Sequence, residues 1–114
     1  MAKYQINLRG DFDELLERVN DEILSGSITA SFEDGSDWQG GGVRCAVRVY
    51  ERYSVSGGNR VSLNLTLVGN GDELFVSAIA SGGSQGMFWK INTFGEESFL
   101  DGLVDVIEGY RRQL

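Results

Sequence analysis

The hydrophobic period of the chain changes twice along its length, and this limits the folds it can adopt. Apolar residues recur at helical spacing over 12–24, alternate with polar residues over 27–81, and return to helical spacing from 99 onward. A period near 3.6 residues is typical of an amphipathic helix, and a period of two is typical of a half-buried strand. The sequence therefore predicts a block of strands that lies between two helices along the chain.

The alternating block divides into strands at its glycine-containing turns, of which Asn70-Gly71 is the strongest hairpin signal. Tyr4, Ile6 and Leu8 alternate in the same way and predict a further strand before the first helix. A long turn is expected over 34–42. The expected strands are 4–8, 27–33, 43–52, 61–67 and 73–81, with a short sixth strand or extended segment at 87–91.

Both helices carry a start signal. Asp11 stands three residues before Glu14, a variant of the capping box in which each side chain accepts from an otherwise unpaired backbone N–H. Thr93 stands three residues before Glu96 and predicts the start of the C-terminal helix. Glycines at 95, 102 and 109 fall seven apart on one flank of that helix. Each costs a helix about 1 kcal/mol relative to alanine, so either something packs closely there or the helix is weak.

These elements predict the fold class. Strands joined by tight turns form an antiparallel meander, and two amphipathic helices must bury their apolar stripes on one of its faces. We therefore expect one two-layer α+β domain over 1–114, with five to six strands and both helices on the same side. The order of elements resembles the TATA-binding-protein-like arrangement and the larger helix-grip folds that elaborate it, without any shared motif.

Composition limits the function classes. The 114-residue chain has a formal net charge of −7, no histidine and a single cysteine, Cys45. A sequence pI near 4.4 disfavours binding to duplex nucleic acid, which basic patches drive. Without histidine, and with one cysteine, a zinc site is excluded, and we expect no metal and no cofactor. Cys45 lies in phase with neighbouring valines, so we expect a buried core residue.

The same composition bears on location. No apolar run approaches the roughly 20 residues that span a bilayer, and residues 1–5 lead directly into alternating sequence with no apolar signal-peptide core. A single cysteine forms no internal disulfide. We therefore expect a cytoplasmic protein with no membrane partner.

Residues Gly82 to Gly86 spell Gly-Gly-Ser-Gln-Gly, the nucleophile-elbow pattern of serine hydrolases. An elbow serine needs a general base, normally a histidine, which this chain lacks. Ser84 is therefore interpreted as part of a glycine-rich connection and not as a nucleophile, and the chain is expected not to be an enzyme. Backbone N–H groups around Gly83, Ser84 and Gln85 remain a candidate anion-binding nest beside Trp89.

A row of arginines is the main candidate for a ligand site. Arg44, Arg48 and Arg52 recur every four residues with Tyr50 among them, so a strand places all four on one face. We expect this face to lie opposite the helices. An arginine row beside an aromatic ring suits a phosphate or carboxylate ligand, or single-stranded nucleic acid. The alternative is an ordinary solvated face with cross-strand ion pairs.

The last strands carry much apolar surface. Phe75, Ile79, Phe88 and Trp89 exceed what one helix layer covers, unless the sheet curls around the C-terminal helix. Exposed surfaces of this kind mark interfaces or ligand grooves. Two functions follow as hypotheses. The first is a non-enzymatic binding module for a small anionic or apolar ligand, using the arginine face or a cavity between sheet and helix. The second is a protein that homodimerises through the outer face of strands 73–91.

Three segments are also similar to a small uncharacterised bacterial family of about this length. They are 31–36 (Ser-Phe-Glu-Asp-Gly-Ser), 42–53 (Gly-Val-Arg-Cys-Ala-Val-Arg-Val-Tyr-Glu-Arg-Tyr) and 90–97 (Lys-Ile-Asn-Thr-Phe-Gly-Glu-Glu). The resemblance implies a relationship over the whole chain, and it implies no activity and no site residues.

Overall fold

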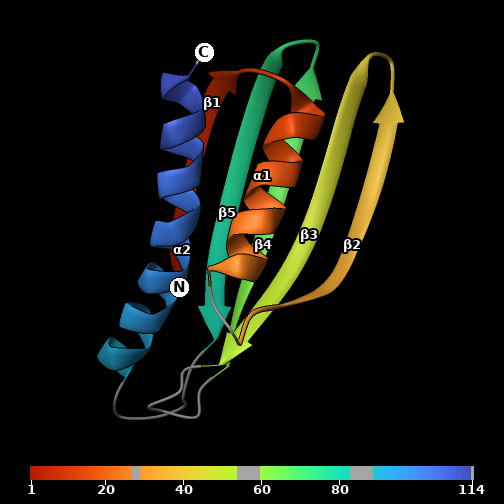
Figure 1. Ribbon diagram of the computed structural model, residues 1–114. Coiled ribbons are helices and arrows are strands. Elements are labelled where there is room, and N and C mark those ends of the chain that lie inside the picture. The colour runs from red at the N-terminus through yellow and green to blue at the C-terminus, as the bar shows by residue number, and fades with distance from the viewer. Residues whose placement is uncertain (27–28, 54–59, 83–88, 114) are drawn as a thin grey trace.

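A computed structural model describes residues 1–26, 29–53, 60–82 and 89–113, with the side chains of 89–98 outside the description. It confirms an α+β fold with one open antiparallel sheet and two helices (Figure 1). In chain order the elements are β1 (Ala2–Arg9), α1 (Phe12–Ser25), β2 (Ser31–Gly40), β3 (Val43–Tyr53), β4 (Arg60–Asn70), β5 (Glu73–Gly82) and α2 (Trp89–Arg112).

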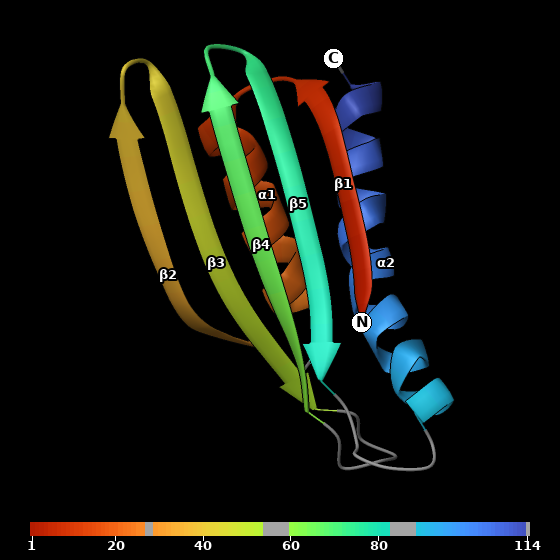
Figure 2. The same cartoon turned by 180° about the vertical axis from the view of Figure 1, so that it is seen from behind.

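The sheet has the strand order β1-β5-β4-β3-β2, so β4 is its central strand. β2 to β5 form a meander of hairpins, and β1 joins the free side of β5. The edge strands β1 and β2 therefore come from neighbouring parts of the sequence and lie at opposite sides of the sheet, as both views show (Figures 1 and 2).

Both helices lie on one face of the sheet, as the sequence predicts (Figure 1). The core fills the space between the two layers. It takes the apolar stripe of each helix and alternate residues of the strands, and the side chains of Leu15, Tyr50, Leu63 and Ile107 within it are fully buried. Figure 2 shows the other face, which no described element covers.

The first helix begins with half of the predicted capping box. The Asp11 side chain accepts a hydrogen bond from the backbone N–H of Glu14 at 2.9 Å. The backbone N–H of Asp11 does not meet the Glu14 carboxylate and instead donates to the Tyr110 hydroxyl at 2.8 Å. Tyr110 is 2% exposed, and this partly buried bond joins the start of α1 to the end of α2.

The predicted start of the C-terminal helix is wrong by about one turn. α2 begins at Trp89, so Thr93 lies inside the helix, and residues 89–91 of the expected sixth strand are helical. No proline or glycine interrupts 89–94. A helix that extends upstream supplies backbone acceptors for the N–H groups that the Thr93 and Glu96 pair would otherwise cap.

The long turn expected over 34–42 is also wrong, because β2 extends to Gly40 and only Gly41 and Gly42 form the turn. Both glycines have positive φ angles of 60° and 83°, which a two-residue hairpin turn of the primed type requires. A register shift between Phe32 and Asp34 marks a β-bulge at Glu33. Polar residues and glycine fit this strand because it lies at the edge and all ten of its residues are exposed.

Replacing Gly109 with alanine is expected to raise the free energy of unfolding by up to about 1 kcal/mol. Gly109 lies inside α2 without a positive φ, and a Cβ atom there would meet no other atom within 4 Å. The alternative of close packing against this glycine is thus excluded within the described chain, and the residue only weakens the helix. Urea unfolding measures the change, and a loss of stability would contradict it.

Candidate functional site

The predicted arginine row lies on one face of β3, but that face is turned toward the helices and not away from them. Ala46 and Tyr50 share the face and are 0% exposed. The prediction of an open arginine face is therefore wrong. β3 lies beside the edge of the sheet, where the helix layer ends. Long arginine side chains can cover apolar surface there while their charged groups reach water.

The three guanidinium groups have different neighbours. Arg44 makes two hydrogen bonds to the Asp13 carboxylate of α1, at 2.8 and 3.0 Å, and stacks over the Phe12 ring. Arg48 pairs with Asp37 of β2 at 2.9 Å. Four residues of a strand span about 13 Å, so these groups do not combine into one anion site. Arg52 is the member of the row that lines the pocket described below.

Tyr50 belongs to the core. Its hydroxyl donates to the Asn20 side-chain oxygen of α1 at 2.8 Å, and its ring meets Phe32 edge to face. Burial raises the pKa of Tyr50 to about 12. The residue ties β3 to α1 and does not line the pocket.

The raised pKa of Tyr50 gives a pH prediction. Because this pKa is higher in the folded chain than the usual value near 10, the stabilisation is complete below pH 10 and is lost as pH rises toward 12. The difference in free energy of unfolding between the wild type and Tyr50→Phe is expected to decrease over this interval by roughly 1.4 kcal/mol per pH unit. Urea unfolding of both proteins from pH 8 to 12 measures the difference, and a constant difference would contradict the assignment.

The remaining predicted residues lie at or beyond the limits of the description. Gly83, Ser84 and Gln85 lie outside the described residues, and Trp89 is placed only as the first residue of α2. Gly82 ends β5 with a φ of 114°, and a Cβ atom there would come within 2.6 Å of the Arg60 carbonyl oxygen. The anion-nest hypothesis for this segment stays a prediction.

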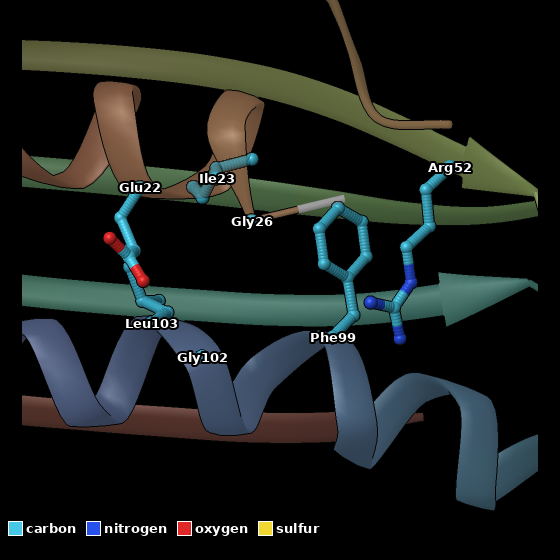
Figure 3. A pocket seen from close by; sticks show the side chains of 7 residues that line it. All are labelled: Glu22, Ile23, Gly26, Arg52, Phe99, Gly102 and Leu103. Atoms are coloured by element: carbon cyan, nitrogen blue, oxygen red, sulfur yellow. The ribbon is translucent and has the colours of Figure 1, made fainter. Parts of the chain in front are cut away.

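A pocket of about 270 Å³ opens between the end of α1, the middle of α2 and the end of β3 (Figure 3). Its walls are apolar where the two helices supply Ile23, Phe99 and Leu103. The guanidinium carbon of Arg52 stands 4.5 Å from the centre of the Phe99 ring. The complete lining is Glu22, Ile23, Gly26, Arg52, Phe99, Gly102 and Leu103.

Charges of opposite sign mark the two ends of this pocket. Figure 3 shows the Glu22 carboxylate on one side and the Arg52 guanidinium on the other. Burial lowers the pKa of Arg52, which means that its guanidinium has lost part of its hydration. A partly desolvated cation attracts an anion more strongly than an exposed one, because less solvent screens the pair.

Two glycines line the pocket, and one of them leaves space in its wall. Gly102 lies in the middle of α2, and a Cβ atom there would meet nothing within 4 Å. Gly26 caps the end of α1, where its N–H donates to the Glu22 carbonyl oxygen. The sequence suggested a cavity between the sheet and the C-terminal helix and showed the glycine spacing in α2, but it did not predict the lining of the pocket, because no local pattern brings Gly26, Arg52 and Gly102 together.

Two further sequence expectations concern other parts of the chain. Cys45 is half-buried on the face that the helices do not cover, so it is not a core residue. Among the described residues no group of three or more acidic or cysteine side chains could hold a metal ion. No helix in the described part of the chain is long and apolar enough to cross a membrane.

The chain belongs to a family of unknown function, DUF6054, whose family model matches residues 1–111. This confirms the predicted membership of an uncharacterised family over nearly the whole chain. No curated protein and no solved structure shows significant similarity to it. The likeness to the TATA-binding-protein-like topology therefore stays a prediction.

Proposed function

We propose that the protein is a non-enzymatic binding module and that its ligand occupies the pocket between α1, α2 and β3. The ligand is a small zwitterion with an apolar body. Its carboxylate pairs with Arg52, its ammonium group lies toward Glu22, and its body packs against Phe99. The observation that carries the proposal is a pocket with apolar side chains from both helices in its wall and opposite charges at its two ends (Figure 3).

Size and chemistry support this class of ligand. Small-molecule pockets usually start near 300 Å³, so about 270 Å³ suits a molecule of amino-acid size. The described lining has one carboxylate and one guanidinium, which supports recognition of a ligand more than cleavage of a bond. We also propose a cytoplasmic location for the protein.

Three related probes test the proposal by isothermal titration calorimetry. L-Phenylalanine has both charges, 3-phenylpropanoate lacks the ammonium group, and 2-phenylethylamine lacks the carboxylate. We expect L-phenylalanine to bind most tightly and 2-phenylethylamine most weakly, because Arg52 is the partly desolvated charge. Equal affinity for the three probes, or binding of none, would contradict the proposal.

A further inference from the structure

Figure 2 shows the face of the sheet that no described element covers. On β3 this face is unusually apolar. An antiparallel sheet with one solvated face normally alternates apolar and polar residues. On β3 the uncovered face instead has Val43, Cys45, Val47 and Val49, all only half-buried. We call this side of the sheet the open face.

The neighbouring strands extend the apolar surface. Val68 of β4 and Phe75 of β5 are partly exposed beside Cys45 in one cross-strand row. At the end of that row Trp38 of β2 is 62% exposed. A large, exposed aromatic side chain beside a row of apolar residues is typical of an interaction surface.

We propose that the open face binds the open face of a second copy of this chain, with the central strand β4 on the two-fold axis of the dimer. The sequence pointed to an outer-face dimer through 73–91. The structure instead places the apolar residues of the outer face mainly on β3, with Val68 of β4 and Phe75 and Ile79 of β5 beside them, and it places Trp89 in a helix. An interface of this kind is isologous, so each side chain must be compatible with the residue that the axis brings to it.

The charged residues of one cross-strand row meet this condition. Asp34, Val49, Asn64, Ile79 and Lys3 form one row that runs from edge strand β2 to edge strand β1. An axis along β4 places each row on the same row of the second copy in reversed order. Lys3 then faces Asp34 of the second copy, twice in the dimer, and Val49 faces Ile79. Opposite charges across an interface favour this orientation over others.

The row at Trp38 is compatible in the same way. It contains Trp38, Cys45, Val68, Phe75 and Asn7. In the reversed order Cys45 faces Phe75 of the second copy, Val68 meets itself, and Trp38 covers the amide of Asn7. The row between the two carries Ser36, Val47, Thr66, Ser77 and Gln5 and has no charge.

Most of the acidic side chains lie away from this interface. The acidic segments 11–22 and 96–112 form most of the two helices, which lie on the opposite face (Figure 1). Most of the excess negative charge of the chain, whose net charge is −7, therefore lies away from the open face. Two copies that meet through it hold their acidic helices apart.

The area of the face suits a dimer. Five strands about 4.8 Å apart, with eight paired residues at about 3.3 Å each, give roughly 600 Å² per copy. Two copies together bury roughly 1,200 Å², the lower end of specific interfaces. We therefore expect a reversible dimer.

Light scattering after size-exclusion chromatography tests the proposal. The wild type is expected to have twice the 12.5 kDa mass of the chain at high micromolar concentration. Thr66→Lys places two lysines against each other on the axis and is expected to give a monomer with unchanged circular dichroism. Leu24→Lys, the same added charge at the end of α1, is the control and should remain a dimer. If Thr66→Lys does not fold, Asn64→Asp replaces it, since it repeats the like-charge contact on an exposed residue.

A charge swap tests the orientation of the two copies. Lys3→Asp and Asp34→Lys are each expected to raise the dissociation constant several-fold, and the double variant is expected to restore it. A monomeric wild type would overturn the proposal, and so would a dimer that survives Thr66→Lys. A double variant no better than the single variants would overturn the axis along β4.

Discussion

Replacing Tyr50 with alanine is expected to lower the free energy of unfolding by about 3–5 kcal/mol, and Val47→Ala by less than about 1 kcal/mol. The two residues are three apart on β3 but belong to opposite faces. Tyr50 is 0% exposed and its hydroxyl bonds to Asn20, so alanine leaves a cavity and an unpaired acceptor. Val47 lies on the open face, where solvent fills the space.

Urea unfolding measures both changes, and it should be carried out in the Asn64→Asp background, because Asn64 is not the cross-strand partner of Val47 or Tyr50. In that background a contribution of Val47 to a dimer does not enter its value. Asn20→Ala removes only the hydrogen bond to Tyr50 and is expected to lower the free energy of unfolding by about 1 kcal/mol. The reverse order, with Val47→Ala more costly than Tyr50→Ala, would show that β3 packs with its other face toward the helices.

Replacing Gly102 with leucine is expected to lower the affinity for L-phenylalanine more than ten-fold while leaving the chain at least as stable. Gly102 lines the pocket, and a Cβ atom there would meet no other atom within 4 Å. Leucine therefore occupies the space where the ligand would lie. Leucine also favours a helix more than glycine does, by somewhat less than about 1 kcal/mol.

Gly109→Leu is the matched control, because Gly109 lies two turns further along the same flank of α2 and outside the pocket. Calorimetry should give this variant the wild-type affinity, with a similar gain in stability. Arg52→Gln is expected to lower affinity for L-phenylalanine and to leave 2-phenylethylamine unchanged. Equal binding by Gly102→Leu and the wild type would place the ligand elsewhere.

The sequence predicts the fold because its periodicity is strong in the elements that build the core. The stripe of α1, the alternation of Leu63, Leu65 and Leu67, and the Asn70-Gly71 turn each have one natural interpretation. The two faces of β3 do not have one natural interpretation, because apolar residues occupy both of them. Valines lie on one face, and Ala46 and Tyr50 lie on the other. Only the long-range contacts of Tyr50 with α1 decide which face is buried, and no local pattern contains them.

The residues that line the pocket could not be predicted from the sequence, for a related reason. Arg52 was predicted as a ligand residue, but through a row of arginines that the fold separates. Glu22, Phe99 and Gly102 come from two helices that are distant in sequence and meet beside Arg52 only in the folded chain. The glycine spacing in α2 was the available signal, since Gly102 weakens its helix and packs against nothing.

The central claim is that the pocket beside Arg52 binds a small zwitterion, and NMR titration of the ¹⁵N-labelled chain with L-phenylalanine tests it most directly. The account predicts that the backbone amides of Ile23, Gly26, Arg52 and Gly102 shift most, in a saturable manner, and that Gly102→Leu abolishes these shifts. Shifts confined to the open face, or none at saturating L-phenylalanine, would contradict it.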